Sequence, residues 1–176
     1  MRLAIKKKEF IQTERLTLKP YSQADTERLT YLITNQEITR YFMVPDFETT
    51  DQIAAAVEKI IAFSQTDDTR HLEYGIYLNE ILIGFINDCG VEEDMIEIGY
   101  VIDPNYQGYG YASEAVRTVI NELKEMGFKK ITAGYFSENT ASRKVMEKCG
   151  MKKSALVEEE EYRGLLHKFF FYEICF

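Results

Sequence analysis

The sequence contains no tryptophan, only two histidines and only three cysteines among its 176 residues. Cys89, Cys149 and Cys175 are odd in number and widely separated, and neither His71 nor His167 has a second ligand at metal-binding spacing. We therefore expect reduced thiols and no bound metal.

Basic residues are scarce. The chain has 21 Lys and Arg against 29 Asp and Glu, a net charge of −8, and a pI near 4.9. This balance argues against a nucleic-acid partner held by general positive charge, and it favours a cationic substrate. Long apolar runs are also missing: residues 53–57 are too few to cross a bilayer, and residues 1–8 lack the apolar stretch of a signal peptide. We expect a cytoplasmic protein with no membrane partner.

Three prolines and ten glycines are too few to form a linker, and no internal repeat divides the chain. With 45% hydrophobic residues, the chain can bury one sizeable core. We predict a single domain that covers residues 1–176.

Apolar periodicity predicts the elements of the first half of the chain. Helical spacing of apolar residues predicts two helices, one after a capping box at Ser22 and one after Thr49-Thr50-Asp51. Alternating and β-rich segments predict four strands, and Cys89-Gly90 falls in the loop before the last of them. These strands are expected at residues 15–20, 72–78, 81–87 and 95–102.

The second half begins with a glycine-rich turn and then alternates helix and strand before a long hairpin around Arg163-Gly164. Its elements are expected at residues 112–127, 131–135, 139–149, 152–162 and 165–176. A strand, a helix and a second strand in this order imply a parallel pair joined by a right-handed crossover. The predicted fold class is α/β: a mixed, mostly antiparallel sheet flanked by helices, with one β-α-β unit.

The turn between the strand at 95–102 and the following helix is suited to bind phosphate. Gly108 and Gly110 expose backbone amides, and the helix N-terminus adds a positive dipole end. No lysine occurs between Gly99 and Val116, which excludes a mononucleotide P-loop. A dinucleotide site of an oxidoreductase remains an alternative, although Ser113 stands where its third glycine belongs.

Gln107-x-x-Gly110-x-Ala112 resembles the Q/R-x-x-G-x-G/A pyrophosphate loop of the GNAT N-acetyltransferase superfamily. Residues 13–20, 97–100 and 139–151 resemble landmarks of its RimJ/RimL-like branch, in matching order. The resemblance covers nearly the whole chain. It implies a GNAT-like fold and transfer of an acetyl group from acetyl-CoA to a primary amine that attacks directly in a ternary complex.

The resemblance also implies which residues hold the coenzyme. The main chain of Tyr100, Val101 and Ile102 is expected to pair with the pantetheine arm, on an edge opened by a bulge in that strand and by its splay from the strand at Ile131. A plain core strand is the alternative. Asn139 and Ser142 are expected to contact the coenzyme further along, and Asn139 also suits a helix cap. The residues expected to cradle the pyrophosphate are Gln107, Gly108, Tyr109, Gly110, Tyr111, Ala112 and Ser113.

Glu97 is the candidate base that deprotonates the amine, directly or through water, because its strand neighbours are apolar. A solvated glutamate is the alternative. Met146 stands where many relatives place a tyrosine that protonates the departing thiolate. Ser142 or water can replace that acid, or the thiolate leaves without one. An amide near Val101 is expected to stabilise the oxyanion, and Cys149 is expected to be packed and not nucleophilic.

The sequence leaves the amine acceptor open. A protein N-terminal α-amine, a free amino acid, a polyamine and an aminoglycoside are all compatible, and so is a homodimer. Besides the oxidoreductase, one further alternative is a CoA-binding sensor or interaction module without turnover, because the tyrosine is absent at Met146.

Overall fold

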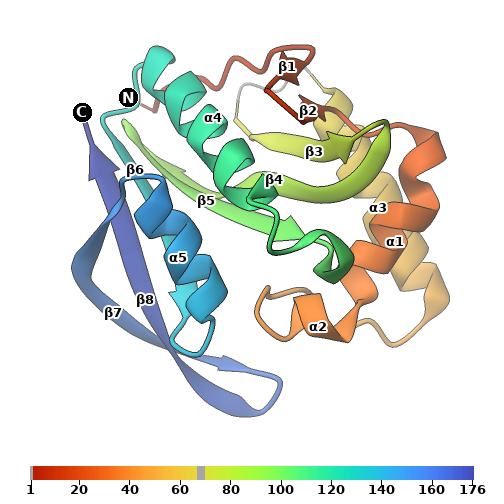
Figure 1. Ribbon diagram of the computed structural model, residues 1–176. Helices are drawn as coiled ribbons and strands as arrows, with labels where there is room; N and C mark the ends of the chain where they lie inside the picture. The colour runs from red at the N-terminus through yellow and green to blue at the C-terminus, as the bar shows by residue number, and fades with distance from the viewer. Residues whose placement is uncertain (1, 67–69) are drawn as a thin grey trace.

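The computed structural model describes residues 2–66 and 70–176, and its centre is an eight-stranded mixed sheet (Figure 1). Its strand order is β1-β2-β3-β4-β5-β6-β8-β7, and every pairing is antiparallel except β5 with β6. The strands are β1 (Ile11–Gln12), β2 (Thr17–Lys19), β3 (Glu73–Leu78), β4 (Ile81–Glu92), β5 (Met95–Ile102), β6 (Lys130–Phe136), β7 (Lys152–Tyr162) and β8 (Leu165–Cys175). The predicted fold class is confirmed.

Within the described residues, five α-helices flank the sheet: α1 (Thr26–Thr34), α2 (Gln36–Thr39), α3 (Thr50–Gln65), α4 (Tyr111–Glu125) and α5 (Thr140–Lys148). Two buried apolar clusters lie on opposite faces of the sheet, one with α1 and α3 and the other with α4 and α5. Strand alternation assigns neighbouring residues of β5 to different clusters, Val101 to the first and Ile102 to the second. Sheet and helices therefore form three layers.

Several local predictions are confirmed. Ser22 and Asp25 form the predicted capping box, at a 3-10 turn (Gln23–Asp25). The second helix, α3, begins at Thr50, two residues earlier than predicted, because Thr49 caps it by accepting from the Gln52 amide. The final hairpin turns at Arg163-Gly164, and both of these residues have positive φ. The four-residue helix α2 has no sequence prediction, because it is too short to show a helical repeat.

The predicted loop at Cys89-Gly90 is wrong. β4 continues to Glu92 because its second half pairs with the beginning of β5, as in Gly90↔Glu97 and Glu92↔Met95. Asp88 pairs with Ile98 and Gly90 with Glu97, so Cys89 is an extra residue in the ladder. The bulge that the resemblance placed in β5 therefore lies in β4.

The divergence of β5 from β6 opens the sheet. Met95–Glu97 of β5 pair with Lys130–Thr132 of β6, and the two strands then separate. Beyond that point β5 remains paired with β4 as far as Ile102. One edge of residues 98–102 is thus free of strand partners within the sheet, as the predicted splay requires. Figure 1 shows β5 and β6 separating, with α4 and α5 in front.

Among the described residues, no helix combines the length and apolar character of a membrane span. The same part of the chain holds no group of three His, Cys, Asp or Glu side chains arranged to bind a metal ion.

Candidate functional site

A cavity of about 850 Å³ lies where β5 and β6 diverge. Its walls come from the end of β5, the turn into α4, the exposed side of α5, the segment around α2 and the tip of the β7-β8 hairpin. The predicted site residues in its wall are Tyr100, Val101, Ile102, Gln107, Gly108, Gly110, Tyr111, Ala112, Ser113, Asn139 and Ser142. Tyr109 and Glu97 are not part of this wall: the Tyr109 side chain is 65% exposed, and Glu97 lies further back on β5.

The turn before α4 has the backbone expected of an anion site. Gly108 and Gly110 have φ of 84° and 87°, a region that favours glycine, and Gly110 is the N-cap of α4. The first amides of α4 have no partner within the helix and point beyond its N-terminus. Gln107 donates from Nε2 to the Ile102 carbonyl at 2.9 Å, so its side chain holds the turn against the end of β5.

A buried carboxylate fixes the start of this turn. The Asp103 side chain is 1% exposed and accepts from Arg28 Nη2 at 2.6 Å and from the Asn105 amide at 2.9 Å. Burial alone would raise the pKa of Asp103, but the Arg28 guanidinium and the Asn105 donors outweigh it and hold that pKa below its ordinary value. Arg28 comes from α1 and also donates to the Leu82 carbonyl. It thus ties the turn to α1 and β4.

Thr13 and Arg15, near the N-terminus, hold the end of the turn that leads into α4. Arg15 pairs with Glu114 of α4 at 2.7 Å and donates to the Tyr109 carbonyl at 2.9 Å, and its guanidinium lies over the Tyr111 ring. Thr13 donates to Glu114 at 2.6 Å. From the sequence, this N-terminal segment is only a landmark of the family resemblance. Glu114, the acidic residue in the first turn of α4, is the sequence signal that could have predicted a partner for Arg15.

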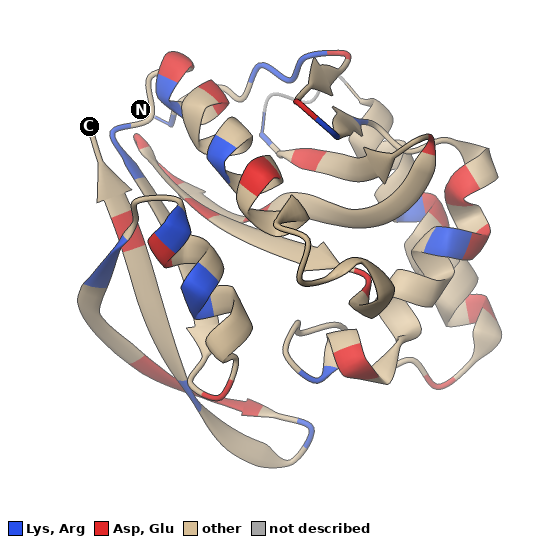
Figure 2. Cartoon of the chain, viewed as in Figure 1, with Lys and Arg blue, Asp and Glu red and all other residues tan. Residues whose placement is uncertain are grey.

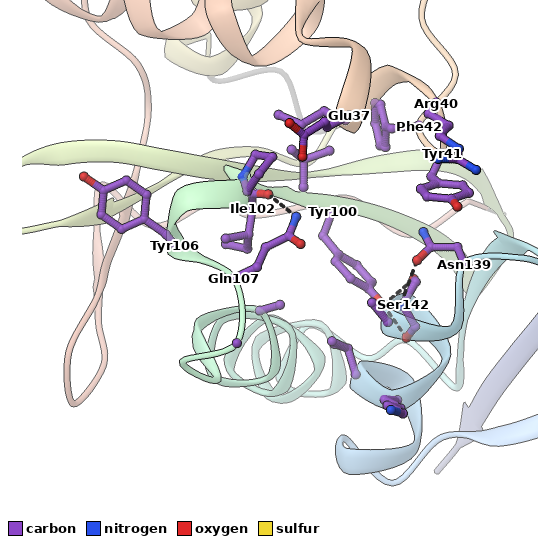
Figure 3. A pocket seen from close by; sticks show the side chains of 18 of the residues that line it. Glu37, Arg40, Tyr41, Phe42, Tyr100, Ile102, Tyr106, Gln107, Asn139 and Ser142 are labelled. Carbon is purple, nitrogen blue, oxygen red and sulfur yellow. Dashed lines mark hydrogen bonds between the residues drawn. The ribbon is translucent and has the colours of Figure 1, made fainter.

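Two side-chain hydroxyls meet in the cavity wall. The Tyr100 hydroxyl lies 2.8 Å from Ser142 Oγ and 3.0 Å from the Ser142 carbonyl oxygen (Figure 3). Burial raises the pKa of Tyr100, so its phenol stays protonated. Asn139 caps α5 by accepting from the Ser142 amide at 3.1 Å, which confirms the expected cap, and it also lines the cavity. Sequence reasoning considered only the main chain of Tyr100 and missed its side chain.

Two sulfur-containing side chains on or beside α5 are structural. Met146 is fully buried, and the Cys149 thiol donates to the Ser113 carbonyl at 3.4 Å inside the core. Burial raises the pKa of Cys149. Cys149 is therefore packed, as predicted.

Glu97 lies at the fork where β5 and β6 separate, since Glu97↔Thr132 is their last pair. Burial, with a smaller contribution from the Glu158 charge, raises its pKa. It shares a face with Gly99, and Cys89 Sγ, Asn87 Oδ1 and Phe42 crowd the space above that glycine. At about 3.3 Å per residue, Glu97 is roughly 10 Å along the strand from Tyr100, where the cavity wall begins.

The cavity wall on the opposite side of β5 comes from two distant segments. In Figure 3, Glu37, Arg40, Tyr41 and Phe42 lie on one side of β5, and Tyr100, Gln107 and Ser142 lie on the other with α4 and α5. The Tyr162 hydroxyl of the hairpin donates to the Thr39 carbonyl of α2 at 2.8 Å. This bond joins the hairpin tip to α2.

Residues 15–152 match the family model described as an acetyltransferase (GNAT) domain. The matched region holds the phosphate-type turn, the free edge of β5 and the cavity wall on α5. The chain belongs to the GNAT acetyltransferase family and is an acetyltransferase.

Particular relatives agree with this class. The "Uncharacterized N-acetyltransferase YoaA" of Bacillus subtilis is 28% identical over 159 residues, covering 88% of this chain and 89% of that protein. A GNAT-family acetyltransferase from Bacillus anthracis has a TM-score of 0.79 at 27% identity, over 94% of this chain and 98% of that one. RimL, a ribosomal-protein alpha-N-acetyltransferase solved with coenzyme A, shares the fold with a TM-score of 0.82 at 19% identity, over 95% and 98% of the two chains.

Proposed function

We propose that the protein transfers an acetyl group from acetyl-CoA to a primary amine, and that the amine attacks the thioester directly in a ternary complex. The observation that carries the proposal is one continuous cavity that joins a helix N-terminus to a free strand edge. The two features suit the two parts of acetyl-CoA, because oriented amides bind pyrophosphate and an unpaired strand edge binds the amides of pantetheine. The coenzyme A bound in RimL supports this assignment for a chain of the same fold.

In this arrangement the turn from Gln107 to Ser113 holds the pyrophosphate, and the main chain of residues 100–102 holds the pantetheine arm. Tyr109 contributes its backbone only, because the residue is largely exposed and is not part of the cavity wall. The thioester then lies against β5, where an amide near Val101 stabilises the oxyanion.

Glu97 is proposed to take the amine proton through water. Its distance of about 10 Å from the cavity wall argues against direct contact with an amine at Val101. Its raised pKa brings it nearer to neutral pH, where a carboxylate accepts a proton more readily.

The departing thiolate is proposed to be stabilised by the Tyr100–Ser142 pair. A phenol with a raised pKa is a poor donor of a whole proton to a thiolate, whose conjugate thiol has a pKa of about 8.5, but it remains a good hydrogen-bond donor. The pair thus occupies the role that the tyrosine missing at Met146 fills in many relatives.

Gly110→Val tests the coenzyme site. A β-branched side chain disfavours the positive φ of 87° and places atoms beside the helix N-terminus, so acetyl-CoA affinity should fall about tenfold or more. Lys59→Ala, on α3 outside the cavity, is the control. Calorimetry gives the affinity, and thiol release gives turnover. Unchanged acetyl-CoA affinity in folded Gly110→Val would refute the assignment, and binding without turnover on any amine would favour a coenzyme sensor.

A further inference from the structure

The charge of the cavity wall is opposite to that of the chain. The chain carries a net charge of −8, yet the wall contains Arg40, Lys144, Lys148 and Arg163 against one carboxylate, Glu37. Figure 2 shows the same distribution, with blue segments on α5, beside α2 and at the tip of the β7-β8 hairpin. Cations concentrated in a cavity of an acidic protein indicate anionic ligands.

The coenzyme accounts for the two lysines. Both lie on α5 at i, i+4 spacing, and Cys149, which follows Lys148, touches the first turn of α4 through the Ser113 carbonyl. Lys144 and Lys148 therefore flank the phosphate-binding turn, where the proposed acetyl-CoA carries its phosphates.

The two arginines are left without such a partner. They belong to the two segments on the far side of the cavity, and the Tyr162–Thr39 hydrogen bond joins the residues immediately before them in sequence. The Arg40 guanidinium lies 4.9 Å from the Tyr41 ring centre. Arg163 is 3.8 Å from Asp46, whose side chain is 80% exposed, so this contact is solvated and weak.

Arg163 also occupies a backbone position that suits other residues. It is the first central residue of a two-residue hairpin turn in which both φ angles are positive, 53° for Arg163 and 73° for Gly164. Asn, Asp and Gly are favoured at the first position of such a turn. Backbone preference therefore does not account for the arginine at this position.

Resting on the proposed function, we propose that Arg40 and Arg163 bind an anionic group, a carboxylate or a phosphate, carried by the amine acceptor. The acceptor enters the cavity beside the hairpin tip and the α2 segment, which the Tyr162–Thr39 hydrogen bond joins, and its anion pairs with the guanidinium groups while its amine reaches the edge of β5. Arginine suits this role because its planar donors match carboxylate and phosphate oxygens. Polyamines and aminoglycosides, which are polycations, are disfavoured. The overall charge of the chain had favoured a cationic substrate; the local charge of the cavity reverses that preference.

The test is a panel of matched amines assayed for thiol release from acetyl-CoA. Its pairs are leucine with leucine amide, phosphoethanolamine with ethanolamine, and a peptide with two glutamates after its N-terminal residue with the same peptide carrying glutamines. Spermidine is the cationic probe. Rates are compared at equal concentrations of unprotonated amine, because the charge alters the amine pKa. We expect the anionic member of at least one pair to have a tenfold or greater advantage in kcat/KM, and which pair shows it identifies the anion.

Arg163→Asn and Arg40→Gln should each reduce that advantage tenfold or more through KM, and the loss should be larger for the anionic member of the pair than for the neutral one. Arg163→Asn should unfold at the same temperature as the parent or higher, because asparagine accepts positive φ. Lys59→Gln, outside the cavity, should change neither quantity. Equal rates within every pair, an advantage that survives both arginine substitutions, or spermidine as the best acceptor would each overturn the inference. Absence of acetylation of every amine would instead refute the proposed function.

Discussion

The ion pair between Arg28 and Asp103 gives a quantitative test of how the phosphate-type turn is held. The Asp103 side chain is 1% exposed and that of Arg28 34%, and their N–O distance is 2.6 Å. Arg28→Met leaves the carboxylate buried without its charge partner. Breaking a fully buried pair costs about 3–5 kcal/mol, and the partial exposure of Arg28 lowers our expectation to about 2–3 kcal/mol.

A second ion pair with the same distance provides the control. Lys19 and Glu80 also lie 2.6 Å apart, but the Glu80 side chain is 79% exposed. Lys19→Met should therefore cost less than about 1 kcal/mol. The contrast between the two substitutions isolates burial from contact distance.

Urea unfolding of Arg28→Met, Asp103→Asn and the double variant measures the coupling. We expect the double variant to lose less stability than the sum of the two single variants, because the second substitution removes the carboxylate that the first left unpaired. The pKa of Asp103 is lowered in the folded state, so the stability from this pair is fully present above the ordinary carboxyl pKa and disappears as pH falls through the lowered value. If Arg28→Met costs no more than Lys19→Met, the turn does not depend on this pair.

Three further predictions concern single side chains. Glu97→Gln should slow acetylation of a lysine-type amine, whose pKa is about 10.4, more than acetylation of an α-amine, whose pKa is about 8, and the rate should partly recover at high pH. Rapid-mixing rates of both enzymes, measured against pH, test this. Identical pH profiles would leave Glu97 a solvated strand residue. Tyr100→Phe should reduce turnover about tenfold or more at unchanged coenzyme affinity, whereas Ser142→Ala should reduce turnover only a few-fold. A larger loss of turnover in Ser142→Ala than in Tyr100→Phe would give Ser142 the main role. Burial raises the pKa of Glu73 to about 8, so the contribution of Glu73 to stability falls as pH rises from about 4.5 to 8. Glu73→Gln should therefore gain stability relative to the parent over that range, by up to about 1.4 kcal/mol for each unit of pKa difference. A stability difference, measured by urea unfolding, that stays constant between pH 5 and 8 would contradict this.

The sequence by itself determined the features whose causes are local. The glycine-rich turn at Gly108 and Gly110, the Asn139 cap and the turn at Arg163-Gly164 depend on a few neighbouring residues, and each is where the pattern placed it. The free edge of β5 was also expected, although through the family resemblance and not through the residues themselves. Local chemistry and motif order together were enough for the fold class and the family.

Tertiary structure decided the features that depend on which segments meet. β4 continues through Cys89 and Gly90 because β5 supplies the hydrogen-bond partners, which no local propensity for a turn reveals. The Tyr100 hydroxyl meets Ser142 across 42 positions of sequence, and the Tyr162 hydroxyl meets Thr39 across 123. The net charge of −8 is a sum over the whole chain, whereas only folding selects which few cations face the cavity. The Tyr162–Thr39 contact joins the residues that precede Arg163 and Arg40, both of which line the cavity. Long-range contacts, and not sequence neighbours, therefore set the local charge of the site.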